Sequence, residues 1–315
     1  MLGWCSITGM TGVELKPQAE RQLPLGEETF LDHIGHFVAS PDAASKGLTE
    51  AGFFATPVSI QEDGGKLTGT GNVTAMMERG YIEVLFKTAD TPLGREFDTA
   101  RARYPGLHLI AFAVSDAKAA SAQLAATGFK TRPIVELRRP VATETGTAEA
   151  AFTVARIEDG EMREGRIQFL THHTEDSVWQ KRWLKHRNGA RGLIDALIAV
   201  GDVDEAAARY VRFLRREAVP TNMGRGIFLE RGGVQLMNAN AFAKLSGIAA
   251  PSLPFIGGYG VRVDSLKTTA AELKSGGLSF DLRDRMLIAR FPSELGTGVW
   301  LFVEQARDLP WRRSS

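Results

Sequence analysis

The chain has 315 residues, 43% of them hydrophobic, so it can bury substantial cores, and its length predicts about two domains. Lys and Arg number 38 against 37 Asp and Glu, a formal net charge of +1 that gives no electrostatic basis for binding nucleic acid or an anionic membrane. No apolar run reaches the roughly 18 to 20 residues of a membrane helix, and residues 1–12 lack the pattern of a secretory signal. The only cysteine, Cys5, excludes an internal disulfide and a thiolate metal cluster, and we expect a reducing, cytoplasmic setting.

One pattern occurs four times along the chain: an apolar strand is followed by a helix that starts at an aspartate. The four strands are predicted at 31–39, 107–114, 193–200 and 256–263. The helix-start aspartates Asp42, Asp116, Asp202 and Asp264 are separated by 74, 86 and 62 residues. This spacing indicates a quadruplicated module rather than a short-period solenoid.

Each module continues from its helix into further strands. Ser40 and Pro41 have the residue types of a helix N-cap and first position, which predicts a helix from 42 to 50. The helices of the later modules are expected at 116–127, 202–214 and 264–275. The remaining strands are expected at 53–60, 72–77 and 81–87; at 129–137, 150–157 and 163–171; near 225–230 and 234–238; and near 278–283, 286–291 and 299–304. The order is βαβββ, with the third module shorter than the others.

The modules form two pairs. We predict an N-terminal extension over 1–29, a first pair over 30–185 and a second pair over 186–315, with a helix-like connector around Trp179 and Trp183 before the boundary. Trp pairs at that spacing more often serve packing than chemistry.

Polar residues interrupt the first pair at matching points. His33 and His108 stand early on the first strand of each module, and Glu83 and Gln168 stand within the last strands, 50 and 60 residues later. A Glu in an apolar strand is expensive to bury unless a cation or donor meets it. Each histidine alone is better explained as a hydrogen-bonded core residue, but the four in register favour a divalent metal site (Fe, Mn, Ni, Co or Zn). Its net positive charge would favour an anionic, bidentate oxygen ligand.

A paired βαβββ unit with His on its first strand and a carboxylate or amide on its fourth resembles the vicinal oxygen chelate superfamily. That superfamily includes glyoxalase I, extradiol dioxygenases and bleomycin resistance proteins; residues 172–190 look like its glyoxalase-like branch. The resemblance implies an α+β fold of four βαβββ modules paired into two open eight-stranded barrel-like sheets with helices outside. It places the metal ligands at His33, Glu83, His108 and Gln168. Glyoxalase I usually has a carboxylate where this chain has Gln168, so Glu83 is the sole candidate catalytic base.

The second pair departs further from the superfamily pattern. The corresponding positions in that pair are Asp195, Gln235, Gly258 and about Trp300, a set unsuited to iron. We therefore expect a degenerate copy that serves as scaffold, lid or dimer surface, and a homodimer remains an alternative.

Three functions are compatible with these residues. The leading one is a metal-dependent enzyme acting on a small, anionic, oxygen-chelating substrate through a lyase or isomerase mechanism with an enolate. The second is an extradiol-type Fe(II) dioxygenase with His33, His108 and Glu83 as ligands, and the third is a metal-free ligand-binding protein. Other polar residues are expected to be structural or at the surface: His36, His172, His173 and His186. Four arginines, Arg132, Arg138, Arg139 and Arg156, either surround an anionic substrate or form a solvated face.

Overall fold

The computed structural model describes residues 17–18, 21–63 and 66–312, and within this part four βαβββ modules follow one another along the chain. The first module comprises β1 (Thr29–Val38), α1 (Pro41–Glu50), β2 (Ser59–Asp63), β3 (Lys66–Met76) and β4 (Tyr81–Lys87). The second comprises β5 (Gly106–Val114), α3 (Ala117–Ala126), β6 (Val135–Thr143), β7 (Gly146–Arg156) and β8 (Arg166–His172). Helix α2 (Pro92–Arg103) connects the two modules.

The third and fourth modules repeat this order. The third comprises β9 (Ala190–Val200), α5 (Val203–Leu214), β10 (Ala218–Thr221), β11 (Gly224–Phe228) and β12 (Gly233–Asn238), so it has the full set of strands. The fourth comprises β13 (Phe255–Val263), α7 (Leu266–Ser275), β14 (Phe280–Arg283), β15 (Met286–Arg290) and β16 (Val299–Val303), and α6 (Ala239–Ser246) precedes it. The prediction of a shorter third module was wrong by one strand.

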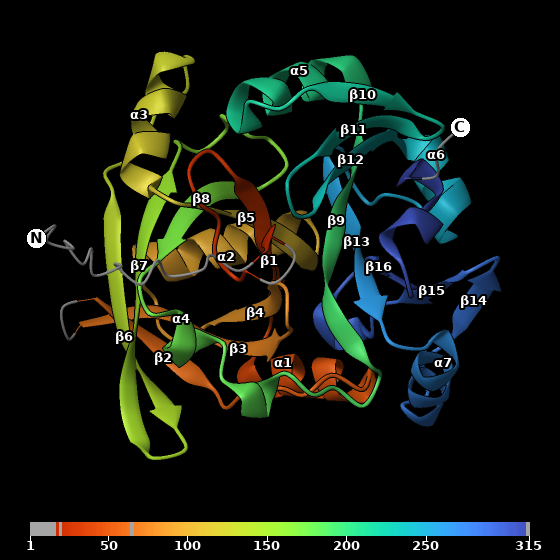
Figure 1. Cartoon of the computed structure of the whole chain (residues 1–315), viewed down its shortest axis with the longest axis horizontal. Coiled ribbons are helices and arrows are strands. Elements are labelled where there is room, and N and C mark those ends of the chain that lie inside the picture. Colours follow the sequence, from red (N-terminus) through yellow and green to blue (C-terminus); the bar gives the residue numbers. More distant parts are fainter. Residues whose placement is uncertain (1–16, 19–20, 64–65, 313–315) are drawn as a thin grey trace, which may run out of the picture.

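Strand pairing gives each half the same architecture. In every module the first strand runs parallel to the last, as in β1 with β4 and β5 with β8. The first strands of each pair of modules run antiparallel to each other, as β1 with β5 and β9 with β13. Each half is an eight-stranded open sheet, and the two join where Ile256 on β13 pairs with Leu107 on β5. Figure 1 shows the first half at the left, the second at the right, and α1, α3, α5 and α7 around the outside. The predicted fold class is confirmed.

The module helices start where capping side chains stand. Ser40 caps α1 by accepting from the backbone N–H of Ala43, with Pro41 at the first position as predicted. Asp116 and Asp202 cap α3 and α5 in the same manner. Ser265 rather than Asp264 caps α7, because the Asp264 carboxylate accepts instead from Arg191.

The connector after β8 contains only the single-turn helix α4 (Glu175–Val178) and a 3-10 turn at Lys181–Trp183. The helix-like connector predicted from Trp179 and Trp183 is therefore much shorter than expected. The predicted domain boundaries at 29/30 and 185/186 stay a prediction.

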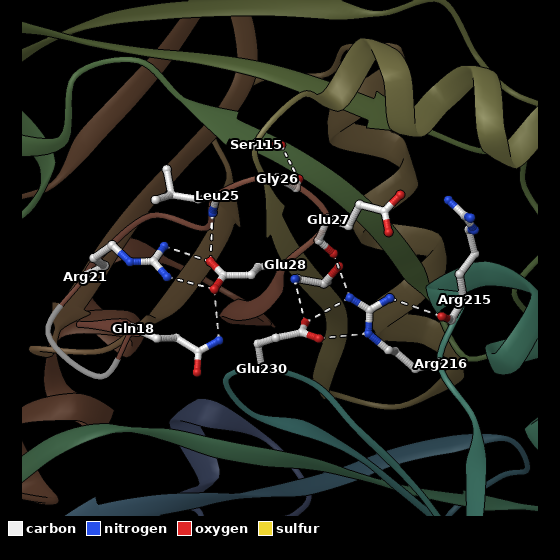
Figure 2. A network of polar contacts seen from close by, with 11 residues as sticks. Gln18, Arg21, Leu25, Gly26, Glu27, Glu28, Ser115, Arg215, Arg216 and Glu230 are labelled. Atoms are coloured by element: carbon white, nitrogen blue, oxygen red, sulfur yellow. Dashed lines mark hydrogen bonds and ion pairs between the residues drawn. The ribbon is translucent and has the colours of Figure 1, made fainter. Parts of the chain in front are cut away.

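The described part of the N-terminal extension is joined to the body by hydrogen bonds. Figure 2 shows the Arg21–Glu28 ion pair within the extension and the Arg216–Glu230 ion pair of the body beside it. Arg216 also donates to the carbonyl of Glu27 at 2.6 Å, and the backbone N–H of Thr29 donates to Glu230 at 2.9 Å. Ser115 donates to the carbonyl of Gly26 at 2.6 Å. These contacts fix the entry into β1.

Among the described residues, no helix combines the length and apolar character needed to span a membrane.

Candidate functional site

The concave side of the first half encloses a cavity of about 380 Å³, called here the module cavity. Its apolar floor comes from Leu85, Leu109, Phe152, Val154 and Leu170. Its polar residues come from both modules: His33, Asn72, Glu83, Arg139, Arg156 and Gln168. Three of the four predicted ligands, His33, Glu83 and Gln168, therefore face one space.

His33 is held in one orientation by a buried carboxylate. Its Nδ1 donates to Asp32 at 2.7 Å, and the other Asp32 oxygen accepts from Nε2 of His172 at 2.9 Å. Burial alone would raise the pKa of Asp32, but the His172 and His33 imidazoles hold it well below its usual range, so Asp32 is an anion. With Nδ1 donating to Asp32, the neutral form of the His33 ring has its lone pair on Nε2, on the cavity side.

Glu83 lies opposite that lone pair. Its Oε2 is 3.5 Å from Nε2 of His33, and its Oε1 accepts from Asn72 at 2.7 Å. Arg139 fixes Asn72 by donating to its Oδ1 at 3.3 Å. A proton taken up by Glu83 can therefore pass to Nε2 of His33, so the two side chains form an acid–base pair.

Gln168 is already engaged. Its Oε1 accepts from Nε of Arg156 at 3.2 Å, so the oxygen predicted to bind a metal faces a cation. Burial, followed by the nearby Arg166, lowers the pKa of Arg156 to about 10, which leaves it protonated at neutral pH. In the described part of the chain, no carboxylate lies at ion-pair distance from Arg156.

His108 lies outside the module cavity. It stacks on Tyr104 with ring centroids 4.2 Å apart, donates from Nε2 to the Tyr104 carbonyl at 2.7 Å, and lines a neighbouring cleft. Burial lowers the pKa of His108 to about 4, so it is neutral at pH 7. The structure does not bring it together with His33, Glu83 and Gln168.

Strand register gives the physical reason. Glu83 pairs with Gly35, two residues beyond His33, and Gln168 pairs with Ala111, two residues beyond Leu109. The position equivalent to His33 in the second module is therefore Leu109, which lines the module cavity. His108 is one residue away, and a shift of one residue in a strand turns the side chain to the other face.

The chain matches a family model described as a glyoxalase-like domain over residues 31–214, which is more than half of its length. It belongs to this family. The predicted resemblance to the vicinal oxygen chelate superfamily is confirmed.

Solved structures share this glyoxalase-like fold at low sequence identity. A hypothetical protein from Staphylococcus aureus superposes with a TM-score of 0.62 at 10% identity, covering 87% of this chain and 98% of that one. A mutant 4-hydroxymandelate synthase from Streptomyces coelicolor superposes with a TM-score of 0.57 at 12% identity, covering 88% and 92%. A xylose isomerase-like TIM barrel/4-hydroxyphenylpyruvate dioxygenase fusion protein gives 0.55 at 13%, covering 90% of this chain and 50% of that one. No curated protein matches the sequence.

The donor set of this glyoxalase-like cavity does not fit the divalent metal centre predicted from the sequence. Leu109 replaces the second imidazole, and Gln168 accepts from Arg156. Within the described residues no three His, Cys, Asp or Glu side chains are grouped to hold a metal ion. Guanidinium groups of Arg139, Arg156 and Arg166 line the same space and disfavour a second cation.

The equivalent positions in the second half are bonded to other parts of the chain. Asp195, equivalent to His33, is fully buried and accepts two hydrogen bonds from Arg312 at 2.6 Å and one from Trp311 at 2.7 Å. Gln235, equivalent to Glu83, bonds to Thr221 and to its own strand. These contacts hold the C-terminal turn in place and indicate a structural role for both residues.

Several residues of the site were missed from the sequence. Asp32 is adjacent to His33 in an apolar strand, so its isolated charge was a usable signal. His172 was expected to be structural, and it supports His33 through Asp32. Asn72 and Arg166 carried no signal, because each lies in a segment of ordinary strand composition. Arg138, Arg139 and Arg156 line the module cavity, whereas Arg132 lies in the neighbouring cleft.

Proposed function

We propose that the module cavity binds a small anionic molecule containing a carbonyl group, without a resident divalent metal, and that Glu83 removes a proton from the carbon beside that carbonyl. The observation that carries this proposal is Arg156. It is a half-buried guanidinium that donates to an amide oxygen at 3.2 Å, and no carboxylate among the described residues lies at ion-pair distance from it. A partly buried cation of this kind is stabilised by an anion that enters the cavity.

The proposed reaction uses the groups already in place. The Glu83 carboxylate takes the proton from carbon, the electron pair of the C–H bond moves to the carbonyl oxygen, and the guanidinium of Arg156 stabilises the resulting enolate. His33 Nε2, 3.5 Å from Glu83, can receive that proton, and the Asp32 anion stabilises the imidazolium. If the carbon that loses the proton carries a hydroxyl group, the intermediate is an enediolate, and its reprotonation at the former carbonyl carbon gives an isomerase. Expulsion of a leaving group from the next carbon gives a lyase.

In this mechanism the Arg156 guanidinium, rather than a metal ion, stabilises the negative charge of the enolate. Glu83 does not have to leave a metal ion before it can act as a base, which removes a difficulty of the metal-dependent alternative.

Two titrations and one exchange measurement test the proposal. Malonate and pyruvate are titrated calorimetrically into wild-type protein and Arg156→Gln, with Arg285→Gln as control because Arg285 is 77% exposed and lies outside the cavity. Binding should weaken about tenfold or more in Arg156→Gln only. Proton NMR in D₂O should show exchange of the pyruvate methyl protons by the wild type, slowed at least a hundredfold in Glu83→Gln on the scale of general-base catalysis, roughly 10²–10⁴.

Elemental analysis of protein purified without chelator tests whether the protein functions without a metal. About one divalent metal ion per chain, lost in His33→Ala, would contradict metal-free function. Tight anion binding with no exchange would instead favour a protein that sequesters its ligand in the same cavity.

A further inference from the structure

A second opening, called here the arginine cleft, lies beside the module cavity and has a volume of about 590 Å³. The two spaces share a wall, because Pro92, Glu96, Arg156 and Arg166 line both of them. A ligand held by Arg156 in the module cavity is therefore next to the cleft.

The cleft is lined by three carboxylates and six arginines. The arginines are Arg95, Arg103, Arg132, Arg156, Arg163 and Arg166. Each carboxylate already has an arginine partner. Arg132 lies 2.8 Å from Asp159 and 3.5 Å from Glu158, and Arg166 lies 2.7 Å from Glu96. His108 adds no charge, because its ring is neutral.

The remaining arginines are not neutralised by the cleft. Arg95 pairs with Asp90, which lies outside it. Arg103 donates to backbone carbonyls, including that of Arg163 at 2.9 Å. For Arg103, Arg156 and Arg163, no carboxylate of the described residues lies at ion-pair distance. The cleft therefore keeps a net positive charge, because its six arginines outnumber its three carboxylates.

Guanidinium groups match phosphate oxygens with two parallel hydrogen bonds, and several of them around one concavity suit a doubly charged anion better than a single carboxylate. We propose that the arginine cleft binds the phosphate group of an elongated ligand whose carbonyl-bearing head occupies the module cavity, with Arg156 and Arg166 between the two ends. This rests on the proposed function and narrows its substrate class to organic phosphates.

Calorimetric titration with inorganic pyrophosphate at low ionic strength tests the cleft directly. Arg163→Gln removes a guanidinium from the cleft and should weaken binding about tenfold or more, as expected for loss of a charge-assisted contact. Arg285→Gln removes the same charge from a distant exposed site and should change binding less than twofold. Equal weakening in both variants would show only general charge attraction and would overturn the inference, as would unchanged binding in Arg163→Gln.

Malonate distinguishes this inference from the proposed function. Arg139→Gln should weaken malonate and spare pyrophosphate, Arg163→Gln should do the reverse, and Arg156→Gln should weaken both. Pyrophosphate should still bind when malonate is saturating, and strict competition would overturn the two-ended ligand. Failure of the proposed function appears in the malonate titration of the wild type, and failure of the phosphate cleft appears in the pyrophosphate titration. Unchanged thermal unfolding of each variant confirms that it is folded.

Discussion

Replacing Leu109 by histidine should create the metal centre that the wild-type donor set lacks. Strand register places Leu109 where a second imidazole would join His33 and Glu83 as a ligand. Leu109 is 2% exposed, so losing its buried apolar surface should destabilise the metal-free variant by about 1.5–3 kcal/mol. Zinc that binds only the folded state restores about 2.7 kcal/mol at a hundred times its dissociation constant. Added zinc should therefore return the unfolding midpoint close to the wild-type value.

The assay is titration with zinc and with cobalt(II), whose visible absorption reports its ligands. Leu109→Asn is the matched control, because it introduces a polar side chain of similar size without an imidazole. Cobalt binding by Leu109→His that does not exceed binding by Leu109→Asn, or that persists when His33→Ala is added, would refute the register argument.

Three further changes test the supporting contacts. Asp32→Asn places an amide beside two imidazole N–H donors and should lower the free energy of unfolding by about 3 kcal/mol in urea, whereas Asp281→Asn at a 67% exposed position should have little effect. Burial lowers the folded-state pKa of three histidines to about 4, from about 6.5 in the unfolded chain, so the unfolded chain binds more protons between these two pH values. The free energy of unfolding should therefore decrease as the pH is lowered, by about 2 kcal/mol per histidine at pH 5. A flat profile of urea midpoints from pH 7 to 5 would contradict this. These histidines are His36, His108 and His186. Arg312→Gln leaves a buried aspartate with one donor fewer on each oxygen and should cost about 3 kcal/mol; an unchanged unfolding midpoint would show that the C-terminal turn is not held by this pair.

Strand and helix patterns were enough to predict the module order, because repeated apolar strands and helix starts carry strong local signals. Boundaries were less predictable where tertiary contacts decide them. Strand β6 was expected at 129–137 but occupies Val135–Thr143 and includes Pro140. Among the described strands it pairs with β7 alone, and an edge strand tolerates a residue without a backbone N–H. Helix α2 was not predicted. Only Gly94 and Phe97 of its twelve residues are buried, so its sequence shows no apolar pattern with helical spacing.

The site was only partly predictable for a different reason. The number of residues between the histidine and the later Glu or Gln aligns the two modules only approximately. An error of one residue in that alignment moves a side chain to the other face of its strand. The bulges between Leu31 and His33 and between Gly35 and His36 change that count locally, and they depend on how β1 and β5 pair. Sequence spacing could therefore identify the correct strand for His108 and still assign its side chain to the wrong space.

The two halves show how one fold supports different uses of the same strand position. His33 and Asp195 are equivalent, and both are anchored by buried ion pairs or charge-assisted hydrogen bonds. In the first half Asp32 holds the imidazole from behind, so that its free nitrogen faces a cavity. In the second half Arg312 and Trp311 donate to Asp195 itself, so both carboxylate oxygens are already paired. Since the equivalent side chain is thereby withdrawn from any ligand, we expect ligand binding at this strand position to be confined to the first half, even though the backbone of both halves follows the same pattern.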